Sequence, residues 1–129
     1  MIPRYSRKEM AELWSEEEKL KHWLEIELLA IEARAELGEI PRKAAREARK
    51  KAGFTLAEVQ AREEITKHDI AAFVDVVGSR LGGLARYLHI GMTSSDLLDT
   101  TFSLQLWKAS AILLKDLDRL LLALKQKAM

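Results

Sequence analysis

The chain has 129 residues, of which 48% are apolar and 32% are charged, and it contains no cysteine. A net charge of +1 gives no general attraction to nucleic acid or to an anionic membrane, and the lack of cysteine excludes disulfides and thiolate chemistry. The first residues contain no apolar signal segment, so we expect a cytoplasmic protein that does not span a membrane.

Helix start and stop signals recur along the chain and predict an all-α fold. The capping-box pattern, a hydroxyl residue with Glu three positions later, occurs at Ser6, Ser15 and Thr55. Glycines that can end a helix follow at 38, 53 and 82–83, and no strand-like alternation persists. These signals place helices at 7–14, 16–37, 42–51, 56–66, 69–82 and 95–127, and leave 84–90 as a loop or one short helical turn.

The helix predicted at 16–37 carries apolar side chains at spacings of three and four, so we expect one face to be buried. The residues of this face are Leu20, Trp23, Leu24, Leu28, Ile31 and Ala35.

The last predicted helix is apolar around most of its circumference, although charged residues interrupt it too often for a membrane span. Such a helix needs cover on nearly every side, and five short helices cannot supply it. We therefore expect further chain or other subunits to cover it. The apolar residues are Leu106, Ile112, Leu113, Leu114, Leu117, Leu120, Leu121, Leu122 and Leu124.

The segment 42–51 holds six basic residues and one acidic residue. A nucleic-acid patch is conceivable, but the segment lacks interleaved aromatic residues and matches no known module, so a solvated helix face is favoured. The chain also lacks the His and Cys spacings of a metal site. We expect no nucleic-acid partner, no metal and no cofactor.

Two polar stretches interrupt this apolar pattern, at 66–69 and 89–96, and together they hold two of the three histidines. The second places Thr93, Ser94 and Ser95 at a predicted helix start, where free backbone N–H groups can bind an anion. Capping alone would also explain one such turn. His68 can transfer a proton near neutral pH, and Asp69 beside it could orient the ring or simply cap the next helix.

Three motifs in order resemble the adenylosuccinate lyase family of the fumarase/aspartase superfamily. They are the opening Ile2-Pro3-Arg4-Tyr5-Ser6, the His68-Asp69 step followed by Ala72-Phe73, and the turn Gly91-Met92-Thr93-Ser94-Ser95-Asp96. The resemblance implies an N-terminal helical domain in 1–110 and the start of a long central-bundle helix in 111–129. It implies a lyase that eliminates fumarate from adenylosuccinate, giving AMP, and from SAICAR, giving AICAR, in purine biosynthesis.

The resemblance also implies binding roles for five residues. Arg4 and Tyr5 match residues that contact the nucleotide phosphate and ribose, and His89 matches a histidine near the phosphate. Thr93 and Ser94 match hydroxyls that hold the succinyl carboxylates.

The 67–69 step matches the family's catalytic region. His68 matches one of two active-site histidines, and its role as the acid or as a substrate-positioning group stays open. Lys67 stands where some members have Arg, and Asp69 is grouped with the substrate-binding residues.

The family is a homotetramer in which three subunits build each site, and its second histidine and mobile serine loop match nothing in this chain. We therefore expect these 129 residues alone to be inactive. Two alternatives remain open: another lyase of the superfamily, and a non-catalytic helical module that binds a protein partner.

Overall fold

The computed structural model describes residues 2–128, which contain helices and no strand, so the all-α prediction is confirmed. The predicted helix at 95–127 begins one residue earlier, and a 3₁₀ helix stands in the region left open. The elements are η1 (Pro3–Tyr5), α1 (Lys8–Leu13), α2 (Glu16–Glu36), α3 (Arg42–Lys51), α4 (Leu56–Thr66), α5 (Asp69–Leu81), η2 (Gly82–Tyr87) and α6 (Ser94–Ala128).

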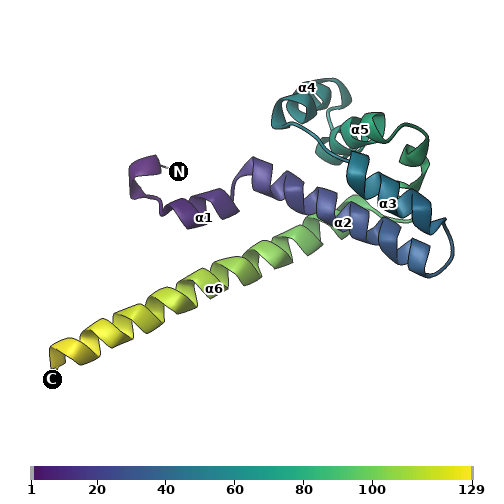
Figure 1. Ribbon diagram of the computed structural model, residues 1–129. Helices are drawn as coiled ribbons and strands as arrows, with labels where there is room; N and C mark the ends of the chain where they lie inside the picture. The colour runs from purple at the N-terminus through teal and green to yellow at the C-terminus, as the bar shows by residue number, and fades with distance from the viewer. Residues whose placement is uncertain (1, 129) are drawn as a thin grey trace.

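Helix α2 is the centre of the fold (Figure 1). Helices α3, α4 and α5 gather on one side of α2, whereas α1 lies beyond its N-terminal end. Helix α6 starts beside α2 and runs away from the α3–α5 group, so η1 and the last turns of α6 lie on the side away from that group.

The predicted face of α2 forms the core with α5. Trp23 on α2 packs edge-on against Phe73 on α5, with 5.5 Å between ring centroids, and Phe54 also packs edge-on against Phe73, at 5.8 Å. Both Trp23 and Phe73 are fully buried. Aromatic pairs of this geometry add stability beyond the burial of their area, so this cluster fixes α5 on α2.

The three predicted capping boxes have three different outcomes. Thr55 forms the complete box with Glu58, and Ser15 accepts from the backbone N–H of Glu18 without the reciprocal bond. The prediction at Ser6 is wrong, because α1 begins one residue later and Arg7 is its N-cap. The Ser6 hydroxyl instead donates to the carbonyl of Ile2, which stabilises the preceding turn.

The Glu58 carboxylate links α4 to α5, because it accepts from Arg80 as well as from Thr55. The Arg80 guanidinium, followed by the hydroxyl and N–H of Thr55, lowers the pKa of Glu58 to about 2. A carboxyl whose pKa is lowered by folding stabilises the protein above its ordinary pKa, and this contribution is lost as the pH falls toward the lowered value.

We expect Glu58→Gln to lower the melting temperature at neutral pH, and the difference from wild type to shrink as the pH falls from about 5 to about 3. Thermal denaturation across this range measures the effect. Glu63→Gln is the control, since this exposed side chain on the same helix makes no hydrogen bond or ion pair within residues 2–128. An equal difference in melting temperature at all pH values would show that the charge of Glu58 does not contribute to stability.

The first half of α6 is anchored along one stripe of buried residues at a spacing of four. These are Leu97, Thr101, Gln105 and Ala109. The Gln105 side chain donates to the carbonyl of Leu13 at the end of α1 (2.9 Å). Lys108 Nζ lies 2.8 Å from Nε2 of the buried His22, so α6 is tied to both α1 and α2.

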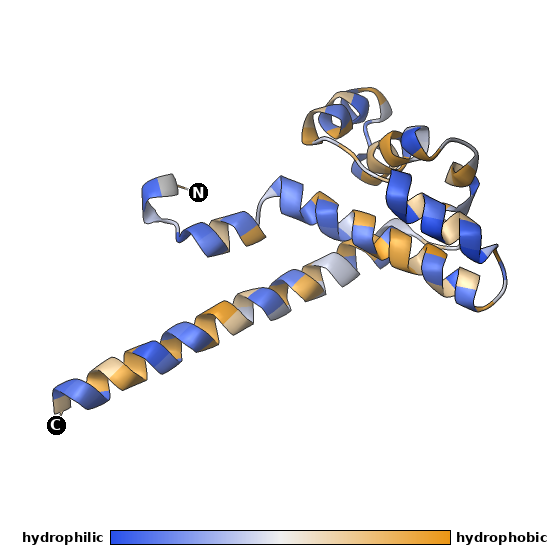
Figure 2. Ribbon diagram, viewed as in Figure 1, coloured by the Kyte–Doolittle hydropathy of each residue, from blue (hydrophilic) through white to orange (hydrophobic). Residues whose placement is uncertain are grey.

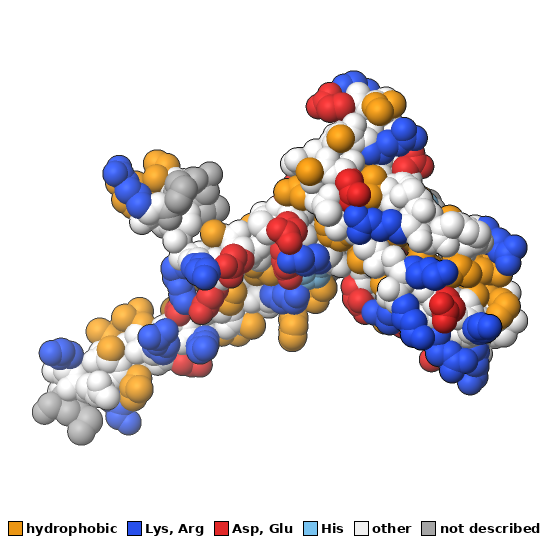
Figure 3. Space-filling view, turned by 45° about the horizontal axis from the view of Figure 1, so that its top comes forward, with side chains coloured by type: hydrophobic (Ala, Val, Ile, Leu, Met, Phe, Trp, Pro, Cys, Tyr) orange, Lys and Arg blue, Asp and Glu red, His pale blue; other side chains and the backbone are white. Residues whose placement is uncertain are grey.

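Beyond this anchored half, α6 leaves its leucines exposed. Figure 2 shows hydrophobic and hydrophilic residues mixed along this part of the helix. Figure 3 shows hydrophobic side chains along this arm, interspersed with Lys and Arg. The exposed residues are Leu113, Leu114, Leu117, Leu120, Leu121, Leu122 and Leu124. As expected from the sequence, no other helix of residues 2–128 covers them. No helix in that range is long and apolar enough to cross a membrane.

The basic helix α3 packs through its alanines and turns its charges outward. Ala44, Ala45 and Ala48 are buried. Arg49 pairs with Glu25 and Glu32 on α2, and these carboxylates raise the pKa of its guanidinium. One of the six basic residues is thus used to fix α3 on α2.

Candidate functional site

The first polar stretch forms the sharp connection between α4 and α5. Lys67 ends α4 in the left-handed conformation (φ 52°), and His68 is the N-cap of α5. The Nδ1 atom of His68 accepts from the backbone N–H of Ala71 (3.3 Å). A ring nitrogen that accepts carries no proton, so the neutral ring has its proton on Nε2. The half-exposed ring thus presents an N–H that can donate a hydrogen bond, whereas donation of a proton would require the doubly protonated ring, in which Nδ1 releases Ala71.

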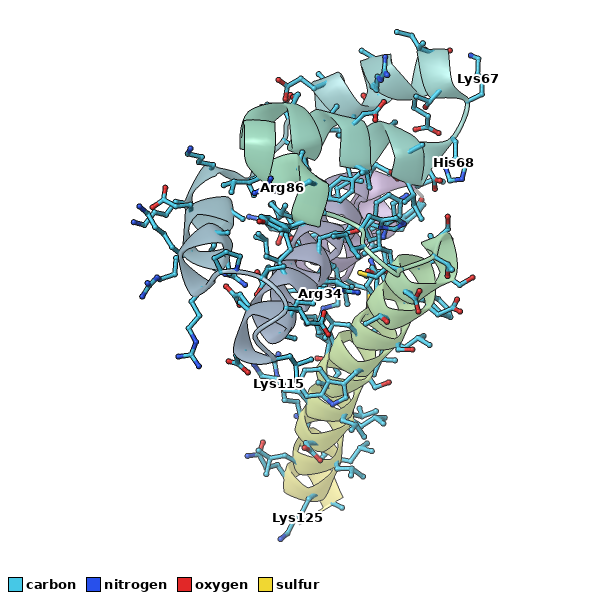
Figure 4. The ribbon with its side chains drawn as sticks, turned by 90° about the vertical axis from the view of Figure 1, so that its right-hand side faces the viewer. Arg34, Lys67, His68, Arg86, Lys115 and Lys125 are labelled. Atoms are coloured by element: carbon cyan, nitrogen blue, oxygen red, sulfur yellow. The ribbon has the colours of Figure 1, made fainter. Side chains whose placement is uncertain are left out.

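The neighbours of His68 are engaged locally. The Asp69 carboxylate accepts from the N–H of Ile70 (2.7 Å), and it lies 3.4 Å from His68 Nδ1, which is already bonded to Ala71. The geometry therefore gives Asp69 the capping role rather than the ring-orienting one. Lys67 pairs with Glu64 (2.8 Å) and points away from the molecule (Figure 4).

The second polar stretch starts at His89, which is bound to a carboxylate that the sequence analysis missed. Glu27 on α2 is fully buried. One of its oxygens lies 2.5 Å from His89 Nδ1, and the other accepts from the His89 backbone N–H (2.8 Å). A signal was present in the sequence, because Glu27 is four residues from both Trp23 and Ile31 on the apolar face of α2. A lone carboxylate at a core position needs a partner.

Arg34 holds the same turn from a point two helical turns further along α2. Its guanidinium donates to the carbonyl of Ile90 (3.0 Å) and pairs with Glu39 (2.7 Å). Gly91 has φ +68°, and a Cβ there would lie 2.9 Å from the guanidinium of Arg34. Glycine at this position therefore permits both the backbone conformation and the close approach of the arginine.

The hydroxyl turn places Thr93 immediately before α6. The Asp96 carboxylate accepts from the Thr93 N–H (2.6 Å) and hydroxyl (3.1 Å). These bonds, together with the nearby His89, lower the pKa of Asp96. The Ser94 hydroxyl has no hydrogen-bond partner in residues 2–128, so it is available to a ligand.

Arg4 and Tyr5 lie in η1, at the N-terminal end of the molecule (Figure 1). The Arg4 guanidinium stacks over the exposed Tyr5 ring, 4.9 Å from its centroid. The structure does not bring these two residues to the α4–α5 connection or to the turn at 89–91.

The predicted site residues thus fall into three groups. His89, Thr93 and Ser94 share one continuous turn, which Glu27 and Arg34 fasten to α2. His68 lies at the same edge of the molecule as the first turn of α6 (Figure 4), but no hydrogen bond joins it to that turn within residues 2–128. Arg4 and Tyr5 form the distant group. In the described part of the chain, no three His, Asp or Glu side chains gather as a metal site requires.

Comparisons with known proteins agree on one family. A family model described as "Lyase" matches residues 4–129. Adenylosuccinate lyases of Streptococcus mutans and Bacillus subtilis are 46% and 44% identical over 128 residues, which is 99% of this chain and 30% of each relative. The crystal structure of a fumarate lyase from Mesorhizobium sp. BNC1 superposes with a TM-score of 0.73 and 28% identity, covering 84% of this chain and 27% of that one.

Proposed function

The chain belongs to the lyase family of the fumarase/aspartase superfamily, and from this premise we propose that it is the N-terminal part of an adenylosuccinate lyase. The complete enzyme would release fumarate from adenylosuccinate, giving AMP, and from SAICAR, giving AICAR, in the cytoplasm and without a cofactor. The observation that carries this proposal is the 40–46% identity to three adenylosuccinate lyases over 99% of the chain. The chain spans about 30% of the length of these relatives.

The reaction sets three chemical demands. A base removes a proton next to a carboxylate, the negative charge that develops on that carboxylate is stabilised, and an acid protonates the departing nitrogen. We assign the stabilisation of the charge that develops on the carboxylate to the Ser94 hydroxyl and the free N–H groups at the start of α6. Thr93 joins them only if its hydroxyl releases Asp96.

His68 either protonates the departing nitrogen as the doubly protonated ring, in which Nδ1 releases the N–H of Ala71, or positions the substrate through its exposed Nε2–H. No residue of 2–128 is assigned as the base that removes the proton. The base would come from the remainder of the enzyme.

The distant group of Arg4 and Tyr5 fits a site shared between subunits. In the proposed homotetramer, these residues would contact the phosphate and ribose of a nucleotide held mainly by another copy. Lys67 and Asp69 would lie at the edge of the site beside His68. In this proposal, residues 1–110 form the N-terminal domain and 111–129 start a long helix of the central bundle.

The exposed leucines of α6 are the proposed contact between copies. An exposed apolar surface of this kind is typical of protein interfaces. We expect Leu114→Lys with Leu121→Lys to shift the 129-residue chain toward monomer in analytical ultracentrifugation, because two charges would be buried without partners. Leu37→Lys is the control, since Leu37 is 75% exposed at the far end of α2. A wild-type chain that sediments as a monomer at tens of micromolar would contradict this interface.

The proposed function is tested by measuring fumarate release from adenylosuccinate by the full-length protein and by the 129-residue chain. We expect turnover from the first and none above buffer from the second, because no residue of 2–128 is assigned as the base. Inhibition by AMP would distinguish this activity from that of another lyase of the superfamily. Turnover by the 129 residues alone would overturn the division of the site between segments.

A further inference from the structure

The buried carboxylate of Glu27 has no role in the chemistry assigned so far. It lies within the apolar face of α2 that packs against α5, and its exposed fraction is 0%. A carboxylate that has lost its hydration needs donors to both oxygens. Its hydrogen bonds within residues 2–128 both come from one residue, the N–H and the ring of His89, which is 62 positions away in sequence.

The two bonds hold both the backbone and the ring of His89. The backbone bond holds a residue in the left-handed conformation (φ 57°), which a side chain with a Cβ adopts rarely. The ring bond occupies Nδ1, so Nε2 is the only ring atom left for a ligand. Nε2 has no hydrogen bond within residues 2–128, and the side chain is 23% exposed. In the protonated ring, Nε2–H is a donor directed away from Glu27.

We infer that Glu27 is the positioning residue of His89, and that it presents His89 Nε2 to the phosphate of the nucleotide. This inference rests on the proposed function, since it deepens the role of His89 in that site. The charged side chains on either side of His89 already have partners, which leaves His89 Nε2 to contact the phosphate. Asp96 near His89 is bonded to Thr93, and Arg34 is bonded to Ile90 and Glu39.

The test uses Glu27→Gln in the full-length enzyme, with the inhibition constants of AMP and fumarate as readouts. Gln keeps the shape of Glu but carries an acceptor on one atom only, so it cannot accept from both the N–H and the ring of His89. We expect the inhibition constant of AMP to rise about tenfold or more, as for loss of a hydrogen bond to a charged group. The constant for fumarate, which lacks a phosphate, should stay within about twofold. Glu32→Gln is the matched control, a half-exposed Glu on α2 that pairs with Arg49 and does not contact His89.

A double-mutant cycle with His89→Ala separates positioning from a general structural role. If Glu27 acts through His89, then Glu27→Gln changes AMP inhibition by less than about twofold in the His89→Ala background. An undiminished effect in that background, an equal loss of AMP and fumarate inhibition, or an unchanged AMP constant would overturn the inference. If Glu27→Gln does not fold, Glu27→Asp, which keeps the charge but shortens the reach, is judged in the same cycle by the same criteria. A wild-type enzyme that does not cleave adenylosuccinate would instead refute the proposed function.

Discussion

Replacing His68 by Asn in the full-length enzyme is expected to lower turnover of adenylosuccinate by about 10²–10⁴-fold, the usual effect of removing a general acid or base. The structure makes Asn the informative replacement. His68 caps α5 through Nδ1, which accepts from Ala71, and Asn is one of the best N-cap residues. The variant therefore keeps the cap and loses only the exposed Nε2–H.

Two comparisons make this prediction decisive. The melting temperature of His68→Asn should stay close to that of wild type, whereas His68→Ala should lose about 1 kcal/mol of stability with the cap. Both variants should lose turnover to a similar degree. If His68→Asn keeps turnover within about threefold of wild type (less than about 1 kcal/mol in the barrier), His68 is a helix cap and not part of the reaction.

Ser94→Ala is expected to lower turnover by about a hundredfold, the cost of removing one donor to a charge that develops in the transition state. Its melting temperature should change little, because the Ser94 hydroxyl makes no hydrogen bond within residues 2–128. Thr93→Ala is the counterpart. The Thr93 hydroxyl donates to Asp96, so its loss should cost roughly 1 kcal/mol of folding stability.

The two hydroxyls are adjacent in sequence, but the Thr93 hydroxyl binds Asp96 and the Ser94 hydroxyl is proposed to bind the substrate. Steady-state turnover and thermal denaturation of both full-length variants measure the difference. Loss of stability in both variants, with turnover close to wild type, would show that the turn only caps α6. The assignment of a carboxylate site to the start of α6 would then be wrong.

Local signals in the sequence determined the secondary structure. Helix ends follow from neighbouring residues, such as the hydroxyl of Thr55 three residues before Glu58, so the predicted bounds agree closely with the observed ones. The exception at Ser6 arose because that hydroxyl had a competing acceptor, the carbonyl of Ile2. The leucines of α6 likewise predicted an apolar surface that the other helices do not cover, because the distribution of apolar residues around a helix follows from the sequence alone.

The tertiary structure alone decided which side chains the site residues contact. His89 and Glu27 are 62 positions apart, and no local pattern connects a carboxylate in an apolar stripe with a histidine in a distant turn. Folding joins them because the buried charge of Glu27 must find donors, and the turn before α6 supplies them. The same holds for Arg34 and Gly91, and for the separation of Arg4 and Tyr5 from His68. Sequence sets local geometry through neighbouring residues, whereas long-range partners depend on how the helices pack.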